Sequence, residues 1–420
     1  MDDYRPRLID KELDECLEAF GAVQIVGPKW CGKTTTASRK SRSSLYMQDP
    51  VTRERSITLA KMDINRILIG EKPRLIDEWQ VIPEIWDAVR FNVDCEGNSG
   101  MFILTGSVTM DLPKGSHTGT GRIYRLHMGT MSLFESGDSN GAVSLRSLFN
   151  GLTIASGESP YSLEDVAKCL VRGGWPQSIG KSENVSLKLI DGYCEGLVEN
   201  DTREYDGVSR DPIRMRPFLR SLSRMLSAPL NKQAIVSDMS ASGSSITLPT
   251  VDDYMKALRA IHVLETLPAW NPNLRSKTVI RTTETLHLCD PAIACHFLNA
   301  SVADLLNDPN TFGLLFESLV IRDLRVYAAS FGGTVFHYRD SNGLEADAII
   351  HTRDGRWAAF EVKLGDAWIE VGAKSLKKLR ENTIDGGMTA PVLLAVIVPT
   401  GYAYTRPDGV SVIPIGCLKD

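Results

Sequence analysis

The chain has 420 residues, which exceeds one ordinary hydrophobic core and predicts about two to four domains. Its composition, 43% hydrophobic and 24% charged, is that of a chain that folds along most of its length. A net charge of −5 excludes a generally basic coat for nucleic acid, although a local basic patch remains compatible with it.

The cysteines and the apolar runs predict the compartment. The eight cysteines form no CxxC pair, and the seven histidines do not cluster with them at zinc-finger spacing, so we expect reduced, mostly buried thiols. No apolar run approaches about 18 residues, and the first residues lack the apolar core of a signal peptide. The sequence therefore predicts a soluble, cytoplasmic protein without a membrane partner.

A strand, a glycine-containing loop and a helix follow one another near the start. After an amphipathic helix within residues 4–20, the apolar run 22–26 predicts a buried parallel strand. The next eight residues match G-x-x-x-x-G-K-[ST], and residues 34–40 can open a helix. This order is typical of a P-loop, whose backbone N–H groups surround a phosphate at a helix N-terminus. The predicted nucleotide-binding residues of this segment are Gly27, Pro28, Lys29, Trp30, Cys31, Gly32, Lys33, Thr34 and Thr35.

Two side chains of this loop have separate predicted roles. Lys33 is expected to reach the β- and γ-phosphates, and the Thr34 hydroxyl to ligate Mg²⁺. The alternative is a chance glycine turn before a helix. The preceding strand and a later acidic strand favour the P-loop.

That acidic strand covers residues 73–77 and ends in Asp77, followed by Glu78. At a strand's carboxyl end after a P-loop, Asp77 is expected to hold the Mg²⁺ shell and Glu78 to polarise the attacking water. The alternative is a solvated acidic turn, which we would favour for an Asp-Glu pair without the P-loop.

The third strong apolar strand, residues 101–107, ends in hydroxyl side chains. Thr105 or Ser107 can lie between the Asp77 strand and the γ-phosphate and sense that phosphate, and we assign Ser107 to the nucleotide site. A helix cap or turn is the alternative for both residues.

A glycine-rich loop over residues 113–122 follows and leads into a strand over 123–128. Arg122 on this loop can neutralise transition-state charge in its own subunit or in a neighbour's, and we assign it a catalytic role. It can equally be a surface residue.

Several motifs now occur in a specific order: the P-loop, Leu75-Ile-Asp-Glu-Trp-Gln80, Leu104-Thr-Gly-Ser107, Met131-Ser-Leu-Phe-Glu135 and Val171-Arg-Gly-Gly-Trp-Pro176. Together they resemble prokaryotic AAA+-like ATPases whose C-terminal half is a domain of unknown function, DUF4143. The resemblance covers about residues 15–365. The resemblance implies that the nucleotide is ATP. No base-recognition motif in the sequence distinguishes ATP from GTP, so this assignment rests on the resemblance alone.

The middle of the chain is predicted to be helical. Residues 136–160 are rich in turn formers and indicate a linker or an excursion of the chain. A helix capped by Ser162 and a second helix over 185–205 resemble the lid of an AAA+-like module, in which Arg172 is a candidate phosphate sensor. Residues 211–290 show three helices and a two-stranded ribbon, a winged-helix outline that docks either DNA or a protein.

The last segment joins a helix over 311–329 to a hairpin. Strand alternation places Glu361 and Lys363 on one face, with Asp347 on the partner strand. A Glu-bearing helix, an Asp and a Glu-x-Lys resemble the PD-(D/E)xK nuclease core, which implies a metal held by carboxylates and a lysine that positions water or stabilises charge. The implied metal ligands are Glu317, Asp347 and Glu361, and the implied lysine is Lys363. The alternative is a hairpin with cross-strand charge pairs, and the run 392–398 is expected to complete the sheet.

These inferences define the predicted fold class, an α/β chain with an AAA+-like parallel sheet, a helical lid, a winged helix and a nuclease-like domain. The predicted boundaries are 1–150, 151–210, 211–290 and 291–420. We expect an ATP- and Mg²⁺-binding, ATP-hydrolysing protein that couples nucleotide state to its C-terminal domains, and a homo-oligomer is a further expectation. The alternative is a nucleotide-gated binding module for protein or nucleic acid whose nuclease-like part is an inactive scaffold.

Overall fold

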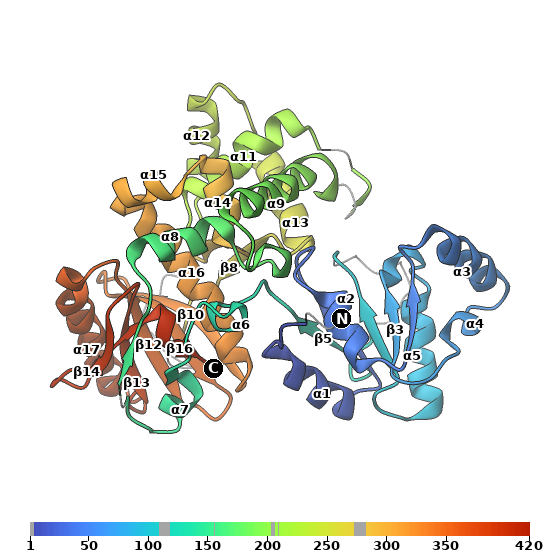
Figure 1. Ribbon diagram of the computed structural model, residues 1–420, viewed down its shortest axis with the longest axis horizontal. Helices are drawn as coiled ribbons and strands as arrows, with labels where there is room; N and C mark the ends of the chain where they lie inside the picture. Colours follow the sequence, from blue (N-terminus) through green and yellow to red (C-terminus); the bar gives the residue numbers. More distant parts are fainter. Residues whose placement is uncertain (1–3, 109–117, 155, 203–205, 209, 273–282) are drawn as a thin grey trace. The chain divides into compact units, whose positions relative to one another are not determined.

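The computed structural model describes residues 4–108, 118–154, 156–202, 206–208, 210–272 and 283–420 (Figure 1). The chain forms two compact units. Unit 1 contains Met1–Thr130, Asp201–Ser209 and Ala257–His262. Unit 2 contains Met131–Asn200, Arg210–Lys256 and Val263–Asp420. Two short later segments therefore group with the N-terminal part of the chain.

Unit 1 contains a five-stranded, all-parallel sheet in the order β2-β3-β4-β1-β5. The strands are β1 (Ala22–Val26), β2 (Ser43–Tyr46), β3 (Arg74–Asp77), β4 (Phe102–Thr105) and β5 (Ile123–His127). The parallel sheet predicted from the apolar runs is confirmed. Because β4 lies between β1 and β3, its carboxyl end adjoins both the P-loop strand and the acidic strand.

Helices cover both faces of this sheet, which is why its central strands β1 and β4 are buried along their whole length, whereas the edge strands β2 and β5 keep exposed positions. The helices are α1 (Ile9–Ala19), α2 (Lys33–Lys40), α3 (Pro50–Met62), α4 (Asn65–Leu68) and α5 (Ile85–Glu96), with a 3-10 turn η1 (Trp79–Val81). On one face Trp86 and Val89 of α5 pack against Phe102. On the other, Leu13 of α1 packs against Val23.

Unit 2 contains a seven-stranded mixed sheet in the order β10-β11-β12-β13-β15-β14-β7. Its strands are β7 (Gly157–Glu158), β10 (Gly333–Arg339), β11 (Glu345–Thr352), β12 (Trp357–Val362), β13 (Leu393–Val398), β14 (Tyr402–Thr405) and β15 (Ser411–Pro414). The expectation that 392–398 completes the sheet is wrong, because β15, β14 and β7 pair beyond it. The supposed linker 136–160 supplies β7, a strand too short for a periodic pattern.

Two long helices flank this sheet, α16 (Pro309–Ala329) and α17 (Ile369–Asp385). Ala373, Leu376 and Leu379 of α17 pack against Trp357 in the core. Smaller elements close the unit: α6 (Leu133–Ser136), β6 (Val143–Ser144), α7 (Leu145–Phe149), η4 (Asp366–Trp368), η5 (Ile415–Cys417) and β16 (Leu418–Lys419). The strand β16 pairs in parallel with β6.

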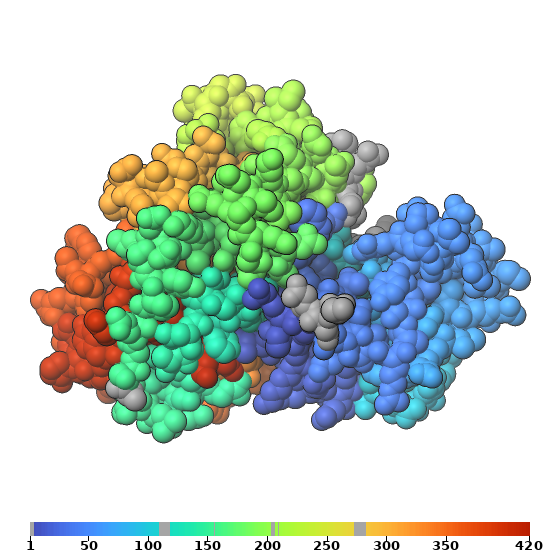
Figure 2. All heavy atoms as spheres, viewed as in Figure 1, coloured from blue at the N-terminus to red at the C-terminus, as the bar shows by residue number. Residues whose placement is uncertain are grey.

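Unit 2 also has a helical part, which lies in the sequence between β7 and α16. It contains α8 (Leu163–Arg172), η2 (Pro176–Ser178), α9 (Glu183–Gly196), a π-helical turn η3 (Leu197–Asp201, whose last residue groups with unit 1), α11 (Pro212–Arg224), α12 (Lys232–Ala241), α13 (Leu248–Ala260), α14 (Pro291–Leu298) and α15 (Val302–Asn307). The helix α8 begins with the predicted capping box, in which Ser162 and Asp165 cap each other's backbone. In Figure 2, the green helices α8 and α9 and the orange α15 form one continuous packed surface.

The predicted three helices and ribbon are present as α11, α12, α13 and the antiparallel pair β8 (Leu264–Leu267) and β9 (Thr285–Leu288). The helix α12 continues to Ala241 before Ser242 ends it. Residues 273–282, within the predicted ribbon, lie outside the described residues. The helices predicted as a lid, α8 and α9, group with unit 2 and pack on α14.

Candidate nucleotide-binding site

The octamer predicted as a P-loop connects β1 to α2 as a tight bend. Gly27 has φ 153° and a Cβ built on it would lie 2.0 Å from the carbonyl oxygen of Met128, so only glycine fits there. Gly32, with φ 108°, turns the chain into α2, which begins at Lys33. The bend therefore ends at a helix N-terminus, where backbone N–H groups are without intrahelical partners.

Lys33 is buried, with 5% of its surface exposed. Its Nζ donates to the carbonyl oxygens of Gly27, at 2.9 Å, and of Pro28, at 2.8 Å. These two bonds fold the ammonium group back over its own loop. A bound phosphate offers charged oxygens, which form stronger bonds to an ammonium group than carbonyls do.

The Asp77 side chain, at the end of β3, is bonded to the first turn of α2 and to the end of β4. Its Oδ1 accepts hydrogen bonds from the Thr34 hydroxyl, at 2.7 Å, and from the Thr105 hydroxyl, at 2.6 Å. The Asp77 side chain is almost fully buried, at 1% exposure. The structure thus brings together Thr34 and Asp77, the two residues predicted to bind Mg²⁺ at this site. Between Thr105 and Ser107, it is Thr105 that contacts Asp77.

Glu78, the predicted catalytic base, follows the strand in the left-handed region, with φ 54°. This conformation costs a non-glycine residue of the order of 1 kcal/mol, and such strain is often found at functional sites. The carboxylate accepts from the Ser107 hydroxyl at 3.3 Å, from Gln48 at 3.5 Å and from Gln80. Neither Gln48 nor Gln80 was predicted to lie at the site, although Gln80 comes only three residues after Asp77.

Arg122 is not brought to the P-loop of its own chain. It directly precedes β5, at the amino edge of the sheet, because Ile123 pairs with Ala22. The P-loop leaves the carboxyl edge. The half-exposed guanidinium donates from Nε to Asp94 at 2.7 Å. The glycine-rich spacing before Arg122 could not reveal this position, and residues 113–117 of that loop lie outside the described residues. A role for Arg122 in a neighbouring subunit remains a prediction.

The C-terminal hairpin brings Asp347, Glu361 and Lys363 together as predicted. Lys363 Nζ lies 2.5 Å from Glu361 Oε2 and 3.5 Å from Asp347 Oδ2, and Asp347 also accepts from the Val362 N–H at 2.7 Å. Burial, and then the nearby Asp347, raise the pKa of Glu361 to about 8. Burial lowers the pKa of Lys363, but Asp347 and Glu361 outweigh it and raise that pKa.

Glu317 on α16 is the fourth member of this group. Burial first, and then Asp347, raise the pKa of Glu317 well above its usual range. Glu317 and Asp347 line a cavity of about 120 Å³. In the described part of the chain, no three Asp, Glu, His or Cys side chains stand close enough to form a metal site by themselves. The ammonium of Lys363 supplies the positive charge beside these carboxylates.

Comparison with known families assigns three segments. Residues 19–136 match an AAA domain, residues 163–304 match the domain of unknown function DUF8612, and residues 312–418 match the domain of unknown function DUF4143. The chain combines an AAA domain with a C-terminal DUF4143 domain. The AAA match contains the P-loop and Asp77, and it supports an ATP-binding, ATPase-like function.

Individual relatives add little about function. Uncharacterized proteins of Mycobacterium bovis and Mycobacterium tuberculosis are each 23% identical over 410 residues, 96% of this chain and 82% of theirs. A Walker-type ATPase of Pyrococcus abyssi has 14% identity and a TM-score of 0.43, over 71% of this chain and 99% of that one.

No helix within the described ranges is long and apolar enough to cross a membrane.

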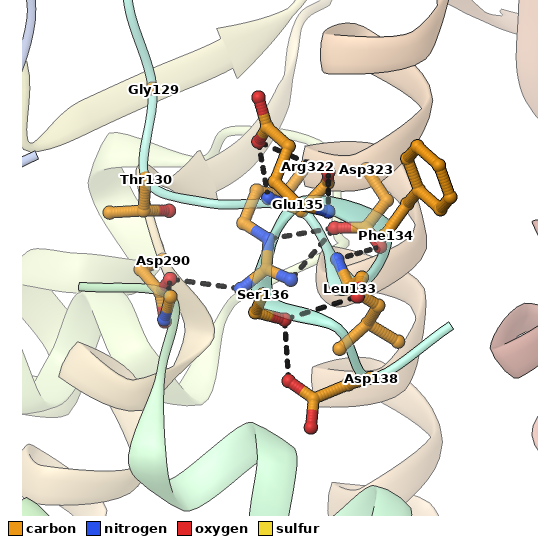
Figure 3. A network of polar contacts seen from close by, with 12 residues as sticks. Gly129, Thr130, Leu133, Phe134, Glu135, Ser136, Asp138, Asp290, Arg322 and Asp323 are labelled. Atoms are coloured by element: carbon orange, nitrogen blue, oxygen red, sulfur yellow. Dashed lines mark hydrogen bonds and ion pairs between the residues drawn. The ribbon is translucent and has the colours of Figure 1, made fainter. Parts of the chain in front are cut away.

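A buried charge network ties the end of the AAA segment to the DUF4143 domain (Figure 3). Arg322 of α16 donates to Asp290 at 3.0 Å and to Asp323 at 2.7 Å, and both carboxylates are fully buried. Asp323 in turn accepts from the Leu133 N–H at 3.0 Å. Asp290, which lies in the DUF8612 segment, also accepts from the Gly174 N–H of the same segment at 2.9 Å.

This network explains two motifs of the sequence. The segments around Met131–Glu135 and Val171–Pro176 meet there, with the Met131 N–H donating to the Gly174 carbonyl at 2.7 Å. Arg172 is an ion-pair partner of Asp138 within unit 2, at 2.5 Å, so its guanidinium is already engaged. The suggestion that Arg172 senses a phosphate is therefore not supported by its contacts.

Proposed function

We propose that this protein binds and hydrolyses ATP at the P-loop and uses the nucleotide state to control its C-terminal domains. The observation that carries the proposal is the convergence of Thr34 and Thr105 on the buried carboxylate of Asp77. A P-loop hydroxyl beside an acidic strand end is the arrangement in which P-loop enzymes hold Mg²⁺.

The residues present fit a magnesium ion. Mg²⁺ in nucleotide sites takes few protein ligands and completes its shell with water and phosphate oxygens. Thr34 and Asp77 supply such ligands, which is consistent with the absence of a three-residue metal cluster among the described residues. When bound there, Mg²⁺ neutralises charge on the phosphates.

The remaining residues have defined tasks in this proposal. The backbone N–H groups of the loop from Gly27 to Thr34 surround the phosphates, and Lys33 leaves its carbonyl partners to bind their oxygens. Thr35 lies in the first turn of α2 behind them. Glu78 orients the attacking water, and Ser107 holds the Glu78 carboxylate from the neighbouring strand end. ATP as the nucleotide rests on the family assignment.

Replacing Glu78 by Gln tests hydrolysis separately from binding. We expect Glu78→Gln to lower the rate of ATP hydrolysis about 100-fold or more, because the amide cannot polarise water as a carboxylate does, while ATP affinity stays within a few-fold. The measurements are phosphate release and titration with a fluorescent ATP analogue, with Mg²⁺ present. Glu84→Gln, at an exposed position six residues on, is the matched control. Unchanged hydrolysis in Glu78→Gln would remove Glu78 from the mechanism.

For the C-terminal unit, we propose a nuclease-like site formed by Glu317, Asp347, Glu361 and Lys363. Its support is the shared position of these side chains and the raised pKa values of the two glutamates, which indicate a crowded acidic site. A divalent cation there has to displace the ammonium of Lys363 from the carboxylates. The helices and ribbon of residues 211–290 are proposed as a winged helix that presents DNA or a protein partner to this unit.

Cleavage of single- and double-stranded DNA and RNA with Mg²⁺ or Mn²⁺ tests this site. We expect metal-dependent cutting that falls at least 100-fold in both Asp347→Asn and Lys363→Met, because each removes a charge from the proposed reaction centre. Asp354→Asn, at the exposed hairpin turn, is the control and should cut like the parent. Absence of cutting by the parent on every substrate favours the second candidate, a nucleotide-gated scaffold whose lysine permanently neutralises the carboxylates.

A further inference from the structure

A carboxylate from far along the chain holds the P-loop. Lys29 Nζ, in the loop itself, lies 2.8 Å from Asp201 Oδ1, although the two residues are 172 positions apart. The pair is partly buried, with side-chain exposures of 27% for Lys29 and 13% for Asp201. Asp201 ends the π-helical turn η3 that follows α9, and it groups with unit 1.

A second late segment reaches the same region of unit 1. Ala257–His262, the end of α13 and its following turn, groups with unit 1, and the His262 ring packs on His127 with ring centroids 5.5 Å apart. His127 pairs with Val26, the residue immediately before the P-loop. Burial, then His127 and then Lys33 lower the pKa of His262 to about 3, so this ring is neutral at pH 7.

Asp201 therefore adds a negative charge beside the P-loop, whereas the neutral His262 ring adds no charge there. A carboxylate next to a loop that receives a triphosphate disfavours the ligand by like-charge repulsion. It also competes with the phosphates for the ammonium of Lys29. Both effects grow with the charge of the nucleotide, and both disappear if Asp201 moves away.

We propose that Asp201 is a positioning residue of the nucleotide site, which holds Lys29 in the nucleotide-free protein and is displaced when a triphosphate binds. This inference rests on the proposed nucleotide binding. Because Asp201 is the last residue of η3, its displacement also moves the turn that follows α9. Nucleotide binding and the Lys29–Asp201 contact then oppose each other, and by linkage each weakens the other by the same factor.

The test measures binding of the fluorescent analogue mant-ATP, with unlabelled ATP, ADP and adenosine as competitors, in the presence of Mg²⁺. Asp201→Asn keeps the shape of the side chain and removes its charge. We expect this variant to bind ATP about three- to tenfold more tightly than the parent, ADP with a smaller gain, and adenosine without change. Glu199→Gln removes the same charge from an exposed position in the same turn and should stay within about twofold of the parent.

The role of Lys29 is tested by repeating the substitution in a Lys29→Met background. If Asp201 acts through Lys29, the fold-increase in ATP affinity caused by Asp201→Asn is at least halved in the Lys29→Met background, because no ammonium group remains to be released. An equal gain in both backgrounds, an equal gain for adenosine, or no gain at all overturns the proposal while leaving nucleotide binding intact. A parent protein that binds no nucleotide overturns both proposals together.

Discussion

Lys33→Ala is expected to abolish ATP hydrolysis, with a loss of about 1,000-fold or more, and to weaken ATP binding about tenfold or more. The reason is that Lys33 is the buried cation inside the loop, held by two carbonyl oxygens within 3 Å and ready to exchange them for phosphate oxygens. Without this ammonium group, charge on the transferred phosphoryl group loses its stabilisation within the loop. Phosphate release at saturating ATP separates the rate loss from the affinity loss.

A matched control lies on the same helix. Lys40, at the other end of α2, forms an exposed ion pair with Asp14 at 2.6 Å, so Lys40→Ala removes an equal charge without touching the loop. We expect it to hydrolyse ATP within about twofold of the parent, since surface pairs contribute little. A Lys33→Ala protein that binds and hydrolyses ATP like the parent would falsify the proposed function.

Arg322→Met is expected to destabilise unit 2 by about 3–5 kcal/mol. Asp290 and Asp323 are both fully buried, and the guanidinium between them is the positive charge to which both bond. Removing that charge while leaving two buried carboxylates costs far more than the loss of an exposed ion pair. Burial lowers the pKa of Arg322, but Asp323 and Asp290 outweigh it and raise that pKa, so the arginine is charged at every physiological pH.

Hydrogen exchange at α16 measures this loss without assuming that the whole chain unfolds in one step. Arg325→Met, three residues along the same helix, removes a partly buried pair with Glu265, in which the side chains are 24% and 19% exposed, and should cost clearly less than Arg322→Met. Replacing Asp290 and Asp323 by Asn together with Arg322→Met should recover part of the stability, because no buried charge then remains. If Arg322→Met and Arg325→Met lose protection equally, the network has no special stabilising role.

The sequence predicted the parts of the site that are local in the chain. The P-loop is a contiguous octamer between a strand and a helix, and Asp77 ends an apolar strand, so spacing and composition were sufficient to find both. The hairpin with Asp347, Glu361 and Lys363 was found for the same reason, because alternation along two neighbouring strands determines which side chains share a face.

The contacts that sequence reasoning missed join distant segments. Asp201 lies among unremarkable polar residues, and only the folded chain places it against Lys29. The position of Arg122 could not be predicted, because a glycine-rich loop before an arginine does not show which edge of the sheet the arginine occupies. The edge strand β7 has only two residues, and its pairing with β14 is set by tertiary packing instead of a local pattern.

Strand pairing in unit 2 joins segments that are far apart in the sequence, and this constrains when the unit can fold during synthesis. At one edge of the seven-stranded sheet, β7 pairs with β14. In a separate two-stranded sheet, β16 pairs with β6. Residues near positions 143 and 157 are thus synthesised before their strand partners, which lie at residues 402–403 and 418–419. Unit 1 can bury its sheet from its first 130 residues, so we infer that it forms during synthesis. Unit 2 can complete these pairings only after β14 and β16 have been synthesised, and a fragment starting at residue 291 would lack both of these early strands.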